Sequence, residues 1–182
     1  MDEGAAAGED VVAVRREHDL PSRVAALVDI ERLTGVAVAL GPGSFTGLRA
    51  GVSFGLGLAL GRRLPLWGLD PLALQAARAP EPATAVIEAG RGRIFWLAPG
   101  SSTPAHGEPA GLPREVPAVG WLGATTASAL AEAGVRFLDE GELRTFAEVA
   151  AEQLPTAERL GYGTVSLRYS MDSFAPARGH RW

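Results

Sequence analysis

Apolar residues in this chain fall into short continuous runs that alternate with stretches of helical spacing. Apolar positions from Val24 to Leu33 recur at helical intervals and predict a helix over 20–33. The run 36–40 is apolar throughout and is bounded by glycines, which predicts a strand buried on both faces. A second helix is predicted over 45–60. Alternation of this kind indicates an α/β fold.

The same alternation continues along the rest of the chain. Further strands are predicted at 11–14, 64–69, 84–88, 93–97, 116–122, 135–138 and 164–169. Further helices are predicted at 71–79, 125–133 and 145–154, the first capped by Asp70 and the last by Thr145. The segments expected to lack regular structure are 1–10, 99–117 and 172–182. A Pro-Glu-Pro break at 80–82 predicts two lobes, 1–79 and 80–182.

The helix predicted over 45–60 is unusually rich in glycine. Each interior glycine costs about 1 kcal/mol relative to alanine. Glycines at 47, 51 and 55 are four residues apart and therefore share one helix face. A face without side chains lets another backbone approach closely. The strip therefore predicts either a protein interface or close packing inside the chain, and the pattern alone does not separate the two.

The turn that precedes this helix has two interpretations. Backbone N–H groups at a helix N-terminus attract anions, and nearby hydroxyls can add donors. A phosphate cradle would use Gly41, Gly43, Ser44, Thr46 and Arg49. The turn matches neither common phosphate-loop pattern, since the chain contains no lysine and the glycine spacing differs. The alternative is a tight turn in which Ser44 simply caps the helix.

Composition narrows the chemistry that is available. Apolar residues make up 47% of the chain, charged residues 21%, and the net charge is −4, which is typical of a soluble globular protein and argues against stand-alone nucleic-acid binding. Cysteine and lysine are both absent, which excludes thiolate, Schiff-base and lysine-base chemistry. No signal peptide is visible, and the apolar run 50–61 is too short to span a bilayer. We therefore expect a cytoplasmic protein that does not enter membranes.

The polar residues form no recognisable catalytic set. The three histidines are widely separated and predict no metal site: His18, His106 and His180. The carboxylates nearest to predicted elements are expected to be capping or solvated acids: Asp29, Glu88 and Asp139. Arg91 and Arg93 are expected to face solvent on a hairpin. The residues taken alone therefore favour a binding or scaffold protein over an enzyme.

One long motif resembles a known family. The segment Gly41-Pro-Gly-Ser-Phe-Thr-Gly-Leu-Arg49, between an apolar strand and a small-residue helix, resembles the hallmark of the TsaB (YeaZ) family. These bacterial proteins take part in making threonylcarbamoyladenosine at position 37 of tRNAs that read ANN codons. Weaker similarity to the same family extends over 64–72, 86–96 and 165–169.

The resemblance implies an actin/Hsp70-like (ASKHA) fold of two ribonuclease-H-like lobes and a non-catalytic subunit. In the family, the partner TsaD transfers the threonylcarbamoyl group, the ATPase TsaE docks on the pair, and TsaB forms a homodimer in isolation. ATP is then used through partners, no cofactor is expected on this chain, and tRNA is contacted only indirectly. The first two helices carry the family's interface, which maps here to Val24, Leu27, Val28, Gly47, Ala50, Gly51, Phe54, Gly55 and Leu58.

The chain departs from the family pattern at its beginning. The family opens with a strand, an Asp-Thr-Ser turn and a second strand, where relatives of this fold bind phosphate. Here 11–14 matches the family's third strand, so the first lobe is expected to be shortened at its N-terminus. Three alternatives stay open: a nucleotide-binding or phosphoryl-handling ASKHA protein, a glycoprotease-like hydrolase, and a structural module whose glycine helix packs only internally.

Overall fold

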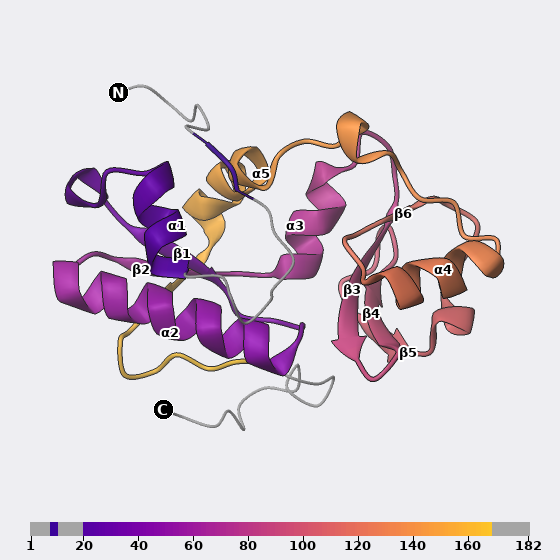
Figure 1. Cartoon of the computed structure of the whole chain (residues 1–182), viewed down its shortest axis with the longest axis horizontal. Helices are drawn as coiled ribbons and strands as arrows, with labels where there is room; N and C mark the ends of the chain where they lie inside the picture. The colour runs from indigo at the N-terminus through magenta and orange to yellow at the C-terminus, as the bar shows by residue number, and fades with distance from the viewer. Residues whose placement is uncertain (1–7, 11–19, 169–182) are drawn as a thin grey trace.

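A computed structural model describes residues 8–10 and 20–168 of the chain. The strand predicted at 11–14 lies outside the described residues, as does the C-terminal segment 172–182. Two sheets form the framework (Figure 1). The first sheet has the order β1-β2-β7, in which β1 (Val36–Ala39) and β2 (Leu66–Leu69) run parallel and β7 (Glu158–Leu160) is antiparallel to β2.

The second sheet has the order β5-β4-β3-β6. Its centre is the predicted hairpin, in which β3 (Thr84–Gly90) pairs antiparallel with β4 (Arg93–Leu97), and Arg91 in the turn has φ 55°. The edges are β5 (Ala105–Gly107) and β6 (Ala118–Val119), the latter parallel to β3. The hairpin prediction is therefore confirmed.

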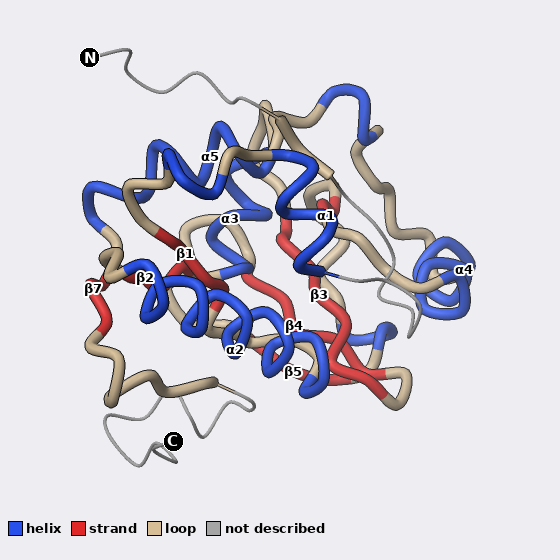
Figure 2. The backbone as a smooth tube through the Cα atoms, turned by 60° about the vertical axis from the view of Figure 1, so that its left-hand side comes forward, coloured by secondary structure: helices blue, strands red, loops and turns tan. Residues whose placement is uncertain are grey.

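Five α-helices pack around these sheets in the part of the chain that the structure describes: α1 (Leu20–Leu27), α2 (Phe45–Arg62), α3 (Pro71–Arg78), α4 (Ala124–Glu132) and α5 (Phe146–Gln153). Helix α2 runs along the first sheet and packs on β1 (Figure 2). Helix α3 contacts β3 of the second sheet and also α5, so it connects the two halves of the molecule. Short 3₁₀ turns complete the fold: η1 (Ile30–Arg32), η2 (Pro109–Gly111), η3 (Glu140–Glu142) and η4 (Leu154–Thr156).

Local capping explains where several helices begin. The Asp70 carboxylate accepts hydrogen bonds from the amides of Leu72 and Ala73 at 2.8 and 3.2 Å. Thr145 and Glu148 form a reciprocal capping box at the start of α5, and the hydrogen bonds from Thr145 hold the pKa of Glu148 below its usual range. Both caps were predicted and are confirmed.

The core of the first sheet lies between its strands and α2. Leu66 is fully buried there, and Val38 and Val52 are 7% and 3% exposed. The segment that follows β7 closes this core with Val165 and Leu167. The first sheet is therefore completed by a strand and a loop that come from the far end of the chain.

Several predicted boundaries are corrected by the structure. The helix predicted over 20–33 ends at Leu27, because the Asp29 side chain caps the separate turn η1 by accepting from the Glu31 amide at 3.0 Å. The region 99–117 is not wholly irregular, since it contains β5 and η2. These short elements lie in a Gly- and Pro-rich stretch, whose composition hides the pairing of β5 with β4.

Three strand predictions fail in part. Only Ala118–Val119 of the 116–122 prediction pairs as a strand, and 135–138 contributes a single bridge between Phe137 and Ala118. Residues 164–168 of the strand predicted at 164–169 form no strand, although the Arg168 amide donates to the Leu40 carbonyl at 2.8 Å. One such bond fixes the segment on the core without forming a ladder. Strand β7 was not predicted, because two of its three residues are charged.

Candidate functional site

An apolar groove of about 410 Å³ lies between α1, β1 and α2. Its lining contains only apolar residues and glycine. The groove brings together most of the residues predicted as an interface: Val24, Val28, Gly47, Gly51, Phe54, Gly55 and Leu58. Leu27 and Ala50 belong to the same prediction but lie outside the lining, where both are exposed. The two helices that the family resemblance predicts as an interface thus build one concave surface.

Helix α1 has an apolar stripe that the described residues do not cover. None of its residues is buried, and Leu20 and Leu27 are 38% and 37% exposed. Val24 and Val28 are half-buried on the side that faces the groove. A helix with this pattern normally places its apolar stripe against a neighbour. The open stripe therefore marks the groove as a surface suited to a partner.

The glycines of α2 have different roles. A Cβ atom at Gly55 would lie 2.4 Å from Val38 Cγ1, so this glycine allows α2 to pack closely on β1. A Cβ atom at Gly51 would meet no other atom within 4 Å, and this glycine lines the groove. The structure thus assigns Gly55 to internal packing, where the sequence placed it on a partner surface. Gly51 leaves space in the groove.

The turn before α2 is built as a helix cap. The Ser44 hydroxyl accepts a hydrogen bond from the Gly47 amide at 3.2 Å, as the simpler interpretation of the turn predicts. Gly41 has φ +104°, and a Cβ there would lie 2.2 Å from the Arg168 carbonyl oxygen. Gly43 follows, half-buried against Leu48. Close approach of the chain after β7 therefore explains the first glycine of the motif.

The remaining members of the turn point outward. Thr46 is exposed, and the Arg49 guanidinium lies 4.9 Å from the centre of the Phe45 ring. Phe45 is itself 57% exposed. These side chains form a surface beside the groove and not a closed cradle around the turn. These positions favour the interpretation that the motif at 41–49 sets the start of α2 and does not bind an anion.

The candidate acids act as caps, as predicted. Asp29 caps η1, and Asp139 caps η3 by accepting from the Gly141 amide at 2.8 Å. Glu88 on β3 accepts from the Gly123 amide at 3.3 Å and from the Thr126 hydroxyl at 2.5 Å, which holds the start of α4 against the sheet. Each carboxylate thus holds the start of a helix or turn, Asp29 and Asp139 locally and Glu88 across a long separation in sequence.

The one candidate histidine within the described residues packs on an aromatic ring. His106 stacks on Phe95 with ring centres 4.6 Å apart, and Arg93 approaches its Nδ1 atom at 3.4 Å. Burial, and then the charge of Arg93, lower the pKa of His106 below its usual value. Arg91 and Arg93 are exposed, as expected for this hairpin. Among the residues that the structure describes, no three His, Asp or Glu side chains gather as a metal site.

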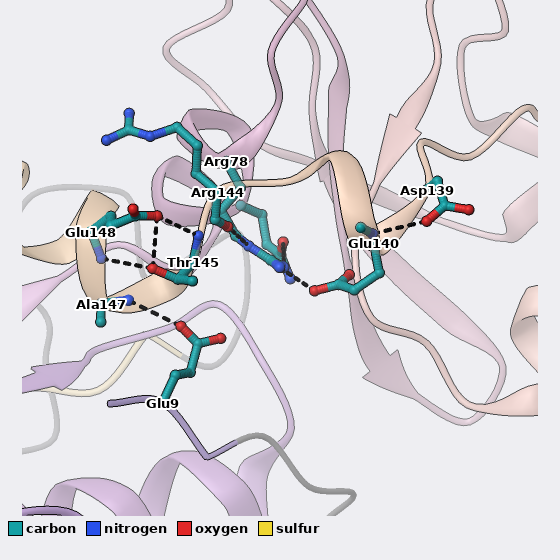
Figure 3. A network of polar contacts seen from close by, with 10 residues as sticks. Glu9, Arg78, Asp139, Glu140, Arg144, Thr145, Ala147 and Glu148 are labelled. Carbon is teal, nitrogen blue, oxygen red and sulfur yellow. Dashed lines mark hydrogen bonds and ion pairs between the residues drawn. The ribbon is translucent and has the colours of Figure 1, made fainter. Parts of the chain in front are cut away.

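A buried arginine was missed by the sequence reasoning. Arg78 ends α3 and is only 2% exposed; its Nε atom donates to the Arg144 carbonyl at 2.7 Å. Its guanidinium also pairs with Glu140 (Figure 3). The same group lies 4.1 Å from the centre of the Phe146 ring. Apart from Gln75, whose side chain accepts from Arg78 at 3.3 Å, these partners come from 60 or more residues away, so no local pattern could reveal them. The network fastens the segment before α5 to α3.

The chain is similar to known proteins in both sequence and fold. A family model described as TsaD, tRNA N6-adenosine threonylcarbamoyltransferase, matches residues 24–108. The solved structure of YeaZ from Pseudomonas aeruginosa has a TM-score of 0.60 at 20% identity and covers 83% of each chain. A second structure, described as an uncharacterized protein with similarity to peptidase YEAZ from Pseudomonas aeruginosa, has a TM-score of 0.53 at 21% identity, over 78% of this chain and 76% of that one. The molecule is thus a mixed α/β protein with a fold similar to that of YeaZ.

One relative is similar to this chain in sequence over a shorter stretch. The tRNA threonylcarbamoyladenosine biosynthesis protein TsaB of Escherichia coli (strain K12) is 43% identical over 75 residues, which cover 38% of this chain and 31% of that protein. The matched part thus spans about a third of the relative's length. Together the matches relate this chain to the TsaB (YeaZ) family, and the resemblance drawn from the motif at 41–49 is confirmed. In the described residues, no helix has both the length and the apolar character needed to cross a membrane.

Proposed function

We propose that this chain acts in threonylcarbamoyladenosine biosynthesis as a non-catalytic docking subunit. In this proposal the groove between α1, β1 and α2 holds a TsaD-like catalytic subunit, which transfers the threonylcarbamoyl group to position 37 of tRNAs reading ANN codons. A TsaE-like ATPase would join the pair and use the ATP, and tRNA would contact the partners and not this chain. The setting for these steps is the cytoplasm.

The open apolar groove carries the proposal. It is formed by the helix that follows the family motif and by a neighbouring helix with no buried residue. The groove contains no acid, base or nucleophile, so its chemistry suits protein contact. The alternative of phosphate handling at the turn has weaker support, because the Ser44 hydroxyl already serves the helix cap.

A pair of matched variants tests the docking surface. Gly51 lines the groove and Gly57 lies on the exposed side of the same helix, and a Cβ at either position would meet nothing within 4 Å. Gly51→Leu would fill the groove, and we expect it to weaken binding of the TsaD-like subunit from the same organism at least tenfold. Gly57→Leu makes the same chemical change outside the groove and should leave binding unchanged.

Isothermal titration calorimetry with the purified catalytic subunit gives the readout. Equal affinity for both variants and the original chain would place the contact elsewhere on the molecule. Failure of the original chain to bind at all would reject the partner itself. Titration with ATP and Mg²⁺ addresses the rival function: micromolar binding that is lost in Ser44→Ala would favour nucleotide handling.

A further inference from the structure

A second pocket, of about 230 Å³, lies where the end of α2, the start of β2 and the end of β7 meet. Residues 63, 65–66 and 159–162 line it, and none of them belongs to the groove described above. Two of these lining residues are arginines, Arg63 and Arg159, and none is acidic. The lining therefore carries two positive charges on a chain whose net charge is −4.

Neither pocket arginine has an acidic partner in the part of the chain that the structure describes. Glu158, the neighbour of Arg159 in the chain, lies 3.8 Å from the Arg168 guanidinium. Glu31 pairs with Arg62, the last residue of α2. The carboxylates next to the pocket arginines in sequence or space are thus engaged elsewhere, and the charge of the pocket is left for a ligand.

The end of α2 does not repel an anion as a bare helix C-terminus would, because donors cover its carbonyl groups. The Ala59 carbonyl accepts from the Leu64 amide at 2.8 Å. The Leu60 carbonyl accepts from the Arg63 amide at 3.2 Å. The Tyr162 hydroxyl donates to the Leu64 carbonyl at 2.5 Å. The wall of the pocket therefore offers few free acceptors to the two guanidinium groups.

The backbone of Arg63 has a conformation that favours glycine. Arg63 is the C-cap of α2 and has φ 55°, in the left-handed region. Helices that end in this conformation usually place glycine there, because a side chain raises its energy. Residues held in such conformations cluster at functional sites. An arginine thus lines the pocket where glycine would be the easier residue for the fold.

We infer that this pocket binds a small phosphate monoester through Arg63 and Arg159. The planar guanidinium fork matches phosphate oxygens and forms charge-assisted hydrogen bonds with them. A phosphate monoester carries about two negative charges at pH 7, which match the two arginines. Pockets for drug-sized ligands have about 300–1,000 Å³, so a pocket of about 230 Å³ suits a phosphoryl group on a small ester. The inference does not rest on the proposed function, since the groove lies elsewhere.

A pair of matched ligands tests the charge of the site. Methyl phosphate is the probe, and dimethyl phosphate is its control, because the second ester group removes one of the two negative charges. NMR titration follows the amides of Arg159, Gly161 and Tyr162. We expect saturable shifts with methyl phosphate and at least tenfold weaker binding of dimethyl phosphate. Affinity for methyl phosphate should rise as the pH passes about 6, where the monoester loses its second proton, and affinity for the diester should not.

Matched variants test the two arginines. Arg159→Gln and Arg63→Gly each remove one charge from the pocket and should weaken methyl phosphate binding at least tenfold. Arg91→Gly is the control, because Arg91 is also an exposed arginine with φ 55° but lies in the hairpin turn between β3 and β4. Glycine favours this conformation, so both glycine variants should fold as stably as the original chain in thermal unfolding.

Three results would overturn the inference. The first is the absence of saturable shifts when methyl phosphate is added to the original chain. The second is unchanged binding in Arg159→Gln or in folded Arg63→Gly. The third is equal weakening in Arg91→Gly, which would mean that methyl phosphate responds only to the overall charge of the protein.

Discussion

The contact between Gly55 and β1 gives the sharpest stability prediction. A Cβ at Gly55 would lie 2.4 Å from Val38 Cγ1 and 3.4 Å from Val36 Cγ1. Val38 is 7% exposed and cannot turn its branched side chain into solvent. Gly55→Ala must therefore overpack the core, which typically costs about 1–3 kcal/mol. The same change gains about 1 kcal/mol of helix propensity, so the net effect is a loss of roughly 0–2 kcal/mol.

Gly51→Ala isolates the packing cost. It carries the same propensity gain, but a Cβ at Gly51 meets nothing within 4 Å. We expect it to stabilise the protein by about 0.5–1 kcal/mol. The difference between the two variants, about 1–3 kcal/mol, is then the cost of the contact with Val38. Adding Val38→Ala should relieve that cost in the Gly55 variant, with a coupling energy of about 1–2 kcal/mol. In the Gly51 variant the cost of Val38→Ala should simply add to the effect of Gly51→Ala.

Urea unfolding followed by circular dichroism provides the assay. A change in the midpoint at constant slope reports stability. The reasoning fails if the two glycine variants shift stability equally, or if Val38→Ala is additive with both. Either result would mean that α2 does not need the missing side chain to reach β1.

Three further predictions concern the frame around the groove. Arg78→Met should lower the free energy of unfolding by about 2–4 kcal/mol, because it removes buried charge-assisted hydrogen bonds. Glu140→Gln should lower it by less than about 1 kcal/mol, since the Glu140 side chain is 61% exposed. Equal losses of the two variants in urea unfolding would contradict this assignment. Gly41→Ala should lower the free energy of unfolding by at least about 2 kcal/mol, since φ at Gly41 is +104° and the Cβ would strike the Arg168 carbonyl oxygen. Gly43→Ala should lower it by less than about 1 kcal/mol. Thermal unfolding compares the two variants, and similar melting temperatures would refute the close approach of Arg168 to Gly41. The NMR titration of His106 should give a pKa below 6.5 because burial disfavours the charged ring, so its contribution to stability is present above pH 6.5 and is lost as the pH falls through the lowered value; a pKa at or above 6.5 would show that the ring is not held as described.

Local signals in the sequence predicted the parts of the fold that depend on neighbouring residues. The caps at Asp70 and Thr145 are fixed by side chains that reach amides two or three residues away. The hairpin of β3 and β4 has its turn between two apolar runs. The cap at Ser44 was also foreseen, as one of two interpretations. In each case the interacting groups lie within a few positions of one another.

Features that depend on distant residues could not be predicted in the same way. Strand β7 pairs with β2 across about 90 residues, and its two charged residues conceal a strand. Arg78 looks like an ordinary basic residue at a helix end, although its partners beyond residue 138 bury it. The glycines at 51 and 55 have the same spacing signal, yet only one of them touches β1. The sequence therefore singled out residues that line one groove, but the different roles of its glycines required the structure.

The central claim is that the groove between α1, β1 and α2 is the docking surface for a catalytic partner. Hydrogen exchange of this chain, measured with and without the TsaD-like subunit from the same organism, tests it most directly. The account predicts that the partner slows exchange in 20–28, 36–39 and 45–58, and leaves the hairpin of β3 and β4 unchanged. Protection confined to the second sheet, or no protection at saturating partner, would contradict the claim.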